Sequence, residues 1–162
     1  MEPVNDYDFE HLNIYQARMG DVDLVAMLVF DLLKELGSHF TRTDEHRMFQ
    51  ACTDLLEEDT PSCAYLALDG NNYPISVLTL SEAFALWAHG RFGMIMEHFV
   101  VPEARSHGIG EKLIQAAVQH GKTRKWRYLQ VATPSGVMGQ RTKKFYKRND
   151  FRQTGDYMQL SL

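Results

Sequence analysis

Met94-Ile95-Met96-Glu97-His98-Phe99-Val100-Val101, followed by Arg105-Ser106-His107-Gly108-Ile109-Gly110, is the stretch that decides the fold. The first segment is apolar and stops at Pro102, which predicts a strand, and the second predicts a loop that opens an amphipathic helix. Glycines in such a loop leave backbone N–H groups free to surround a phosphate ester, and the positive end of the helix would face the same anion. Many strand-to-helix turns use glycine for steric reasons alone, so the loop by itself leaves both interpretations open.

Regular elements are predicted on both sides of this stretch. Upstream, a strand is expected over His11–Arg18, a helix from Asp21 to Gly37, a helix over Thr43–Glu58 and a hairpin of Cys63–Leu68 with Tyr73–Leu80. Downstream, we expect a strand over Trp126–Val131, a helix ending at Arg148, a strand starting at Phe151 and a last strand over Tyr157–Leu160. Three antiparallel strands followed by a parallel α/β crossover predict a mixed sheet.

Composition restricts the function classes. The chain has 162 residues, enough for a single domain over 1–162, and residues 1–10 are expected to form a loose end. A net charge of −4 offers no electrostatic footprint for nucleic acid. The apolar run Leu24–Leu36 is interrupted by charges and is too short to cross a membrane. Cys52 and Cys63, without a secretory leader, favour free thiols in the cytoplasm.

Two motifs resemble those of one family. Phe99-Val100-Val101 with Arg105 to Gly110 is similar to the CoA motif of the GNAT superfamily of acyl-CoA-dependent N-acyltransferases, and Phe145-Tyr146-Lys147-Arg148 resembles its late aromatic motif. The resemblance implies an α/β fold with a central, mostly antiparallel, twisted mixed sheet of about six to seven strands flanked by about four helices. It also implies acetyl-CoA as the cofactor.

Within that superfamily the chain is similar to the polyamine and diamine acetyltransferase branch, which pairs a tryptophan hairpin with a carboxylate on the next strand. The matching segments are Leu80–Trp87, Gly90-Arg91 and Met96–Val101. Two positions depart from the pattern. His98 stands where the branch usually has a second acid, and Gly139 stands where the family commonly has an asparagine that contacts the cofactor.

Acyl transfer from a thioester to an amine needs a base for the ammonium, a donor to the carbonyl oxygen and a proton for the leaving thiolate. Glu97 is the predicted base; the alternative is a carboxylate that faces solvent or pairs with a lysine. Tyr146 is the predicted acid, because the pKa of a phenol lies slightly above that of a thiol; the alternative is an aromatic packed beside Phe145. A backbone N–H within Phe99–Val101 is expected to hold the carbonyl oxygen.

The remaining site residues follow from the resemblance. Arg105 is expected to pair with phosphate, Lys112 to add positive charge, and His107 to act through its backbone N–H. The full predicted cofactor set is Phe99, Val100, Val101, Arg105, Ser106, His107, Gly108, Ile109, Gly110, Lys112, Gly139 and Phe145.

Three side chains are predicted on the acceptor side. Trp87 and Phe84 either wall the acceptor pocket or pack in a dimer. His98 is the neighbour of Glu97, but adjacent strand residues point to opposite faces unless a bulge intervenes. We expect no metal, since the histidine spacings suit no shared ligand set.

These features predict an N-acetyltransferase that transfers an acetyl group from acetyl-CoA to a primary amine of a small molecule by direct attack in a ternary complex. The acceptor is expected to be an amino acid, a diamine or polyamine, or an aminoglycoside-like compound. We expect a cytoplasmic homodimer with neither a nucleic-acid nor a membrane partner. The alternatives are a protein lysine or N-terminal acetyltransferase and a non-catalytic acyl-CoA-binding regulator.

Overall fold

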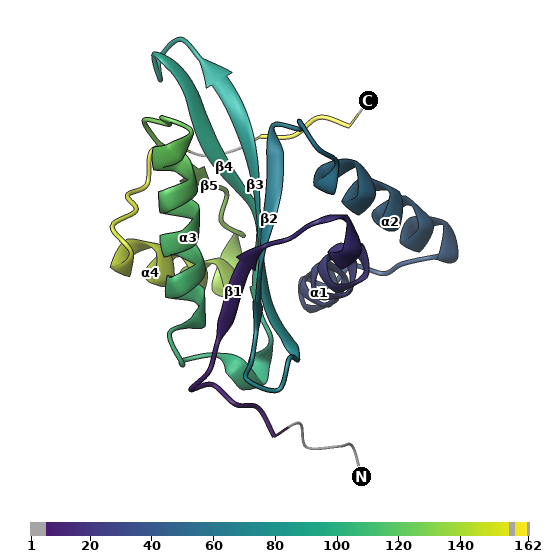
Figure 1. Ribbon diagram of the computed structural model, residues 1–162. Coiled ribbons are helices and arrows are strands. Elements are labelled where there is room, and N and C mark those ends of the chain that lie inside the picture. The colour runs from purple at the N-terminus through teal and green to yellow at the C-terminus, as the bar shows by residue number, and fades with distance from the viewer. Residues whose placement is uncertain (1–5, 156–157, 162) are drawn as a thin grey trace.

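The computed structural model describes residues 6–155 and 158–161 and arranges them as a mixed sheet between two helical layers (Figure 1). The sheet has five strands in the order β1-β2-β3-β4-β5. The strands are β1 (Asn13–Gln16), β2 (Ser62–Leu68), β3 (Pro74–Ala85), β4 (Gly90–Val100) and β5 (Leu129–Val131). The helices are α1 (Val22–Glu35), α2 (Arg42–Leu56), α3 (Ile109–Thr123) and α4 (Gly136–Arg148), with two 3-10 turns, η1 (Met19–Asp21) and η2 (Pro102–Ala104). This confirms the predicted GNAT-type architecture.

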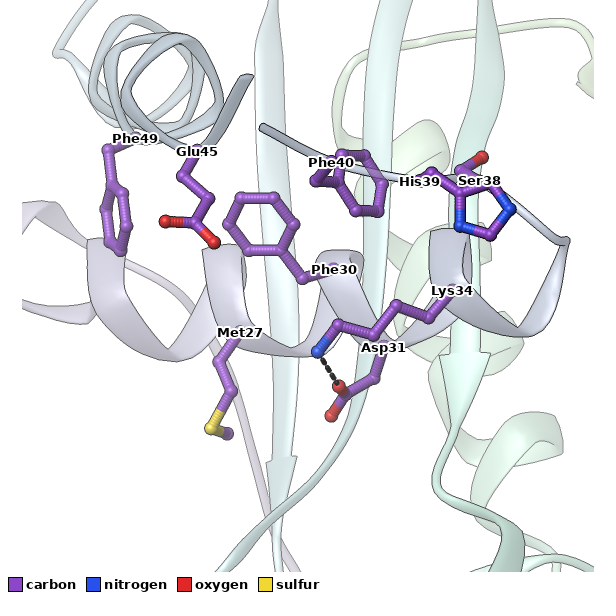
Figure 2. Close-up of a pocket in the computed structure, with 9 residues that line it drawn as sticks. All are labelled: Met27, Phe30, Asp31, Lys34, Ser38, His39, Phe40, Glu45 and Phe49. Carbon is purple, nitrogen blue, oxygen red and sulfur yellow. Dashed lines mark hydrogen bonds and ion pairs between the residues drawn. The ribbon is translucent and has the colours of Figure 1, made fainter. Parts of the chain in front are cut away.

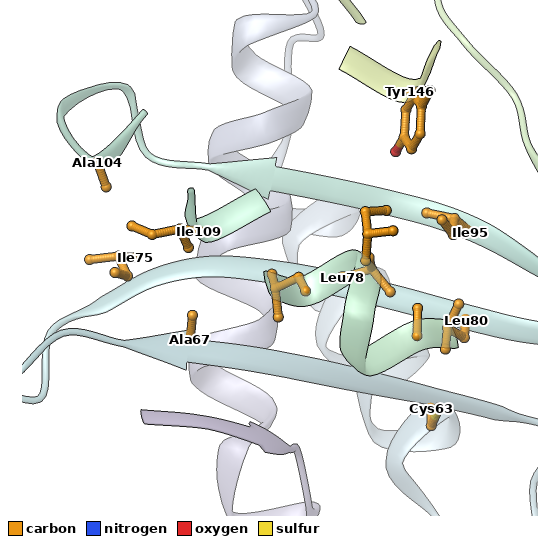
Figure 3. Close-up of a cluster of buried hydrophobic side chains, with 12 residues drawn as sticks. Cys63, Ala67, Ile75, Leu78, Leu80, Ile95, Ala104, Ile109 and Tyr146 are labelled. Carbon is orange, nitrogen blue, oxygen red and sulfur yellow. The ribbon is translucent and has the colours of Figure 1, made fainter. Parts of the chain in front are cut away.

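Each face of the sheet has its own core. Helices α1 and α2 cover one face, and α3 and α4 cover the other (Figure 1). On α1, Val25, Leu28 and Val29 form the buried stripe, and Gly37 (φ +85°) follows the helix in the left-handed conformation that ends many helices. Figure 3 shows the opposite core, where the hydroxyl of Tyr146 points toward β4.

Strand β4 changes neighbours along its length. It pairs antiparallel with β3 and parallel with β5, but the pairing with β5 covers only Gly93–Ile95 against Leu129–Val131. From Met96 to Val100 no described strand pairs with β4 on its β5 side. Backbone groups on that edge are therefore available to another molecule.

The sheet has fewer strands than the six to seven expected, because no strand forms in the described part of the C-terminal segment. Phe151 does not start a strand: its N–H donates to the Tyr146 carbonyl at 3.0 Å and its ring packs on Tyr146, so the residue ends α4. Met158 and Leu160 are almost fully exposed and gain no burial that would order a strand. Tyr157, also predicted in that strand, lies outside the described residues.

Strand β5 begins three residues later than predicted. Lys125 adopts a positive φ (+60°), and the Trp126 N–H donates to the Gly121 carbonyl at 2.8 Å, so Trp126 closes the end of α3. Its ring lies so close to Gly93 that a Cβ there would come within 2.2 Å of it. Trp126 thus anchors α3 to β4 instead of extending the strand.

The described part of the N-terminal segment is anchored. The Asp8 N–H donates to the buried Asp69 carboxylate at 2.9 Å, and the Phe9 ring packs on His107 with centroids 4.2 Å apart. This differs from the loose end expected for residues 1–10, of which 1–5 lie outside the described residues. None of the helices formed by the described residues has the length and hydrophobicity of a membrane span.

Candidate active site

A β-bulge in β4 organises the site. Leu78 pairs with His98 and Leu80 with Ile95, so the single residue Thr79 lies opposite Met96 and Glu97 together. The extra residue interrupts the alternation of side chains where β4 loses its partner β5. The bulge and the unpaired strand edge therefore occur at the same place.

Glu97 faces the α1–α2 layer and is held by Thr79. The Thr79 hydroxyl donates to Oε2 of Glu97 and accepts the Glu97 backbone N–H at 3.0 Å. Thr79 is buried, whereas Glu97 is half-buried. Burial, with a smaller contribution from the charge of Glu97, raises the pKa of the Cys52 thiol on α2 to about 11, which places the carboxylate near that helix. Glu97 is thus an oriented carboxylate with access to solvent.

His98 and Tyr146 meet on the opposite face. Nδ1 of His98 lies 3.1 Å from the Tyr146 hydroxyl oxygen, and the His98 ring packs on Phe145 with centroids 5.5 Å apart. Tyr146 is only 5% exposed, and burial raises the pKa of its phenol. Burial also lowers the pKa of His98 to about 4, so the imidazole is neutral near pH 7. Glu97 and His98 point to opposite faces, as alternation predicts, so the structure places His98 beside the predicted acid and away from the predicted base.

The predicted phosphate loop opens α3. Gly108 is the N-cap of α3 with φ +74°, and no side chain caps the helix. In the described structure the first-turn N–H groups of residues 109–111 therefore lack a capping partner. Ser106 also has a positive φ (+68°), and Lys112 is exposed in the first turn. These are the features of an anion-binding helix N-terminus.

Arg105 is engaged within the protein. Its guanidinium forms an ion pair with Glu35 at the end of α1 (2.5 Å), its Nε donates to the Val100 carbonyl (2.9 Å), and it lies over the Phe99 ring. In this arrangement Arg105 links the loop to α1, whereas the sequence predicted pairing with phosphate.

His107 is likewise engaged in contacts within the chain. Its Nδ1 lies 2.9 Å from the Arg105 carbonyl oxygen, and its ring contacts Phe9. These contacts fix the orientation of the ring, although the residue is exposed.

Two glycines allow close packing around the site. A Cβ on Gly110 would come within 3.1 Å of the Phe145 ring, so this glycine lets α3 approach the aromatic pair of α4. A Cβ on Gly139 would come within 1.7 Å of the Pro134 carbonyl oxygen. This backbone has no room for the asparagine common in the family, so only the main chain of Gly139 can contact a cofactor.

The hairpin aromatics lie away from Glu97. Phe84 and Trp87 are at the tip of the β3–β4 hairpin, which extends beyond the rest of the sheet (Figure 1). Phe84 is five residues along β3 from Thr79, a separation of about 17 Å. Trp87 packs on Phe92 and Tyr128, with ring centroids 5.1 and 5.7 Å away. The structure does not bring these predicted acceptor residues together with Glu97.

A separate cavity of about 490 Å³ lies between α1, α2 and their connecting loop (Figure 2). Three aromatic rings and two carboxylates line it, and the Asp31 carboxylate is paired with Lys34 at 3.3 Å. Its lining consists of Met27, Phe30, Asp31, Lys34, Ser38, His39, Phe40, Glu45 and Phe49. None of the predicted site residues belongs to this cavity.

Comparison with known proteins identifies the family. A family model described as an acetyltransferase (GNAT) domain matches residues 62–153. The chain belongs to this family. No curated protein matches the chain. The matched region of this GNAT domain contains the bulge, the phosphate loop and the helix that carries Tyr146.

Solved structures share the fold at low sequence identity. A possible acetyltransferase from Clostridium difficile 630 has a TM-score of 0.78 at 18% identity, covering 93% of this chain and 97% of that one. A predicted acetyltransferase from Clostridium acetobutylicum, solved with acetyl-CoA, has a TM-score of 0.77 at 19% identity, covering 93% and 96%. A ribosomal-protein-alanine N-acetyltransferase from Brucella melitensis biovar Abortus 2308 has a TM-score of 0.70 at 16% identity, covering 94% and 98%. At these identities the comparisons establish the fold alone.

Sequence reasoning missed Thr79 and Glu35. Thr79 is a hydroxyl residue within the buried run Ile75–Leu80, and a polar residue in such a run is the one signal that could have indicated it. Glu35 is the exposed last residue of α1, and nothing in the neighbouring sequence predicts its ion pair with Arg105. Both act through contacts with residues far away in the sequence.

Proposed function

We propose that this GNAT domain is an N-acetyltransferase that transfers the acetyl group of acetyl-CoA to a primary amine of a small molecule. The observation that carries the proposal is the position of Glu97 at the β4 bulge, on the face of the strand opposite Tyr146. A base on one face and a proton donor on the other flank the point where β4 leaves β5. A direct attack on a thioester uses both groups, a base for the amine and a proton donor for the leaving sulfur.

Three features fit acetyl-CoA as the donor. The uncapped first turn of α3 suits the pyrophosphate, and the unpaired edge of β4 from Met96 to Val100 suits an extended arm that carries amide groups. Nε2 of His98 is a buried polar atom with no hydrogen-bond partner in the described chain. When bound, acetyl-CoA supplies an acetyl group activated as a thioester.

Each step of the proposed reaction is then assigned to a residue of the chain. An amine with a pKa near 10 is protonated at neutral pH, and Glu97 removes that proton directly or through a water. Thr79 holds the carboxylate in place while it does so. The backbone N–H groups of β4 near the bulge donate to the carbonyl oxygen, and Tyr146 donates toward the sulfur. No covalent bond to the protein is needed.

A small amine is favoured over a protein acceptor by the surroundings of Glu97. The carboxylate is half-buried between β4 and the α1–α2 layer, where a single ammonium group fits better than a folded surface. A protein acceptor and a non-catalytic CoA-binding regulator are outcomes that the experiment separates.

The test combines calorimetry with an amine screen. Acetyl-CoA and dephospho-CoA are titrated into wild type, Gly108→Trp and a control, Gly37→Trp, which imposes the same positive-φ strain away from the loop. We expect micromolar binding of acetyl-CoA that is lost only in Gly108→Trp. Amines, peptides and proteins are then screened by thiol release.

Turnover with small amines that falls in Glu97→Gln supports the proposal. Turnover with peptides alone contradicts the small-amine acceptor. Binding without any turnover supports a regulator, and a lack of binding contradicts the CoA-dependent activity.

We also propose that the protein is a homodimer that packs through the hairpin tip. Phe84, Leu86 and Trp87 are all more than half exposed there, which is unusual for three large apolar side chains so close together. Light scattering on wild type and on Leu86→Glu tests this: the variant is expected to be monomeric. A wild-type monomer, or a dimer that survives the substitution, contradicts it.

A further inference from the structure

The ring of His98 is enclosed between β4 and the α3–α4 layer. It packs on Phe145, and a Cβ on Gly110 would lie 3.6 Å from its Cε1. Nδ1 lies 3.1 Å from the Tyr146 hydroxyl oxygen, and Nε2 is buried without a partner in the described residues. Because the ring is neutral at physiological pH, it carries one N–H, on either Nδ1 or Nε2.

The two tautomers leave Tyr146 in different states. With the proton on Nε2, the Tyr146 hydroxyl must donate to Nδ1, and its proton is then directed into the protein. With the proton on Nδ1, His98 donates to the phenol oxygen instead. The hydroxyl proton is then free to point elsewhere, and Nε2 becomes an acceptor for a donor from outside the chain.

Tyr146 needs such a donor if it is to act as an acid. Burial raises the pKa of its phenol and so makes it a weaker proton donor than a free tyrosine. A hydrogen bond donated to the phenol oxygen stabilises the phenolate as the proton leaves, which opposes the effect of burial. His98 is positioned to donate that bond. An ionised acid at position 98, as in the branch this chain resembles, could only accept.

We propose that His98 is a positioning residue for Tyr146: in the productive state it carries its proton on Nδ1, donates it to the phenol oxygen, and thereby directs the hydroxyl proton toward the departing sulfur. This inference rests on the proposed acetyl transfer. As the C–N bond forms and the C–S bond breaks, Tyr146 gives its proton to sulfur. The resulting phenolate is held by Nδ1–H of His98 and regains a proton from solvent.

The first test reads the tautomer directly. The full chain is labelled with ¹⁵N-histidine, saturated with acetyl-CoA, and studied by NMR; His98→Asn, which lacks these signals, assigns them. We expect a protonated Nδ1 and an unprotonated Nε2. A protonated Nε2 in the complex overturns the proposal. This readout needs no acceptor, so it remains informative if the amine screen finds none and the proposed function fails.

The second test compares variants with the best acceptor of the screen. His98→Leu removes the donor, whereas His98→Asn keeps an N–H close to the Nδ1 position. We expect His98→Leu to lower kcat about tenfold with little change in the KM for acetyl-CoA, and His98→Asn to restore most of that loss. In a Tyr146→Phe background His98→Leu should cost nothing further in kcat. Independent, multiplying effects of the two substitutions overturn the proposal, and thermal unfolding of each variant excludes misfolding as the cause.

Discussion

The two faces of β4 present the proposed base and the proposed acid in opposite environments. On the α1–α2 face, Glu97 is half-buried and held by a threonine hydroxyl. On the α3–α4 face, Tyr146 is buried against aromatic rings and touches a neutral histidine. A base for a charged amine needs access to water and an ion, whereas a donor to a leaving sulfur works better where water is excluded. Alternation of side chains along β4 separates the two environments, and the bulge lies where they meet.

The largest expected effect comes from removing the negative charge of Glu97 on the α1–α2 face of β4. Glu97→Gln keeps the shape of the side chain but eliminates the base, so kcat should fall about 10²- to 10³-fold. Calorimetry should find acetyl-CoA binding unchanged, because the phosphate loop is untouched. Glu58→Gln in the exposed turn after α2 is the matched control and should retain full activity. If Glu97→Gln turned over substrate at the wild-type rate, Glu97 on the α1–α2 face would have no role in the chemistry.

Burial of His98 on the α3–α4 face should make the free energy of unfolding depend on pH. The pKa of His98 is lowered by burial from 6.5 to about 4 in the folded protein. Between these values the unfolded chain binds the extra proton, so stability is fully present above pH 6.5 and is lost as the pH falls toward 4. The loss attributable to His98 should be about 3 kcal/mol.

Urea unfolding of wild type and His98→Asn across this pH range measures that loss. Asparagine does not titrate, so the variant should lose less stability on acidification. Other groups, such as His120 with its lowered pKa, contribute equally to both proteins and cancel in the difference. Parallel pH dependences for the two proteins would show that the ring is not buried as a neutral group.

A smaller effect should follow from loosening Glu97 without removing it. Thr79→Val preserves the volume of this buried residue but deletes the hydroxyl that bonds both the carboxylate and the backbone N–H of Glu97. We expect kcat to fall about tenfold through misplacement of the base. Ser76→Ala, which removes another buried hydroxyl of β3 that bonds only the Phe99 carbonyl, should cost stability but little kcat. Equal kinetic losses in both variants would assign the effect to general destabilisation.

The smallest expected effect is a change in the alkylation rate of a cysteine. Cys52 and Cys63 lie in the cores on the two opposite faces of the sheet. Burial raises the pKa of both Cys52 and Cys63 to about 11, but only Cys52 also senses the charge of Glu97. Glu97→Gln should therefore accelerate alkylation of Cys52 about two- to threefold and leave Cys63 unchanged. Mass spectrometry after limited iodoacetamide treatment measures both rates in the same sample. A parallel change at both cysteines would indicate general loosening and not the lost charge.

Local patterns predicted much of this molecule. The glycines of the phosphate loop, the stop at Pro102 and the apolar run before it were enough to place the strand-to-helix junction, and alternation alone separated Glu97 from His98. The strand expected at Phe151 was wrong because Phe151 closes α4, and the strand expected from Trp126 begins only at Leu129 because Trp126 closes α3. Helix-ending contacts and strand propensity favour the same aromatic residues, so the pattern did not distinguish them.

Local sequence was enough to predict the order of the elements from β1 to α4, a loop suited to phosphate, and the faces to which neighbouring side chains point. These depend on residues a few positions apart, whose geometry the backbone dictates. Three contacts depend instead on tertiary packing: Thr79 with Glu97, His98 with Tyr146, and Arg105 with Glu35. Such contacts depend on strand register, on a one-residue bulge and on how helices dock, and these are set by the packing of the whole core.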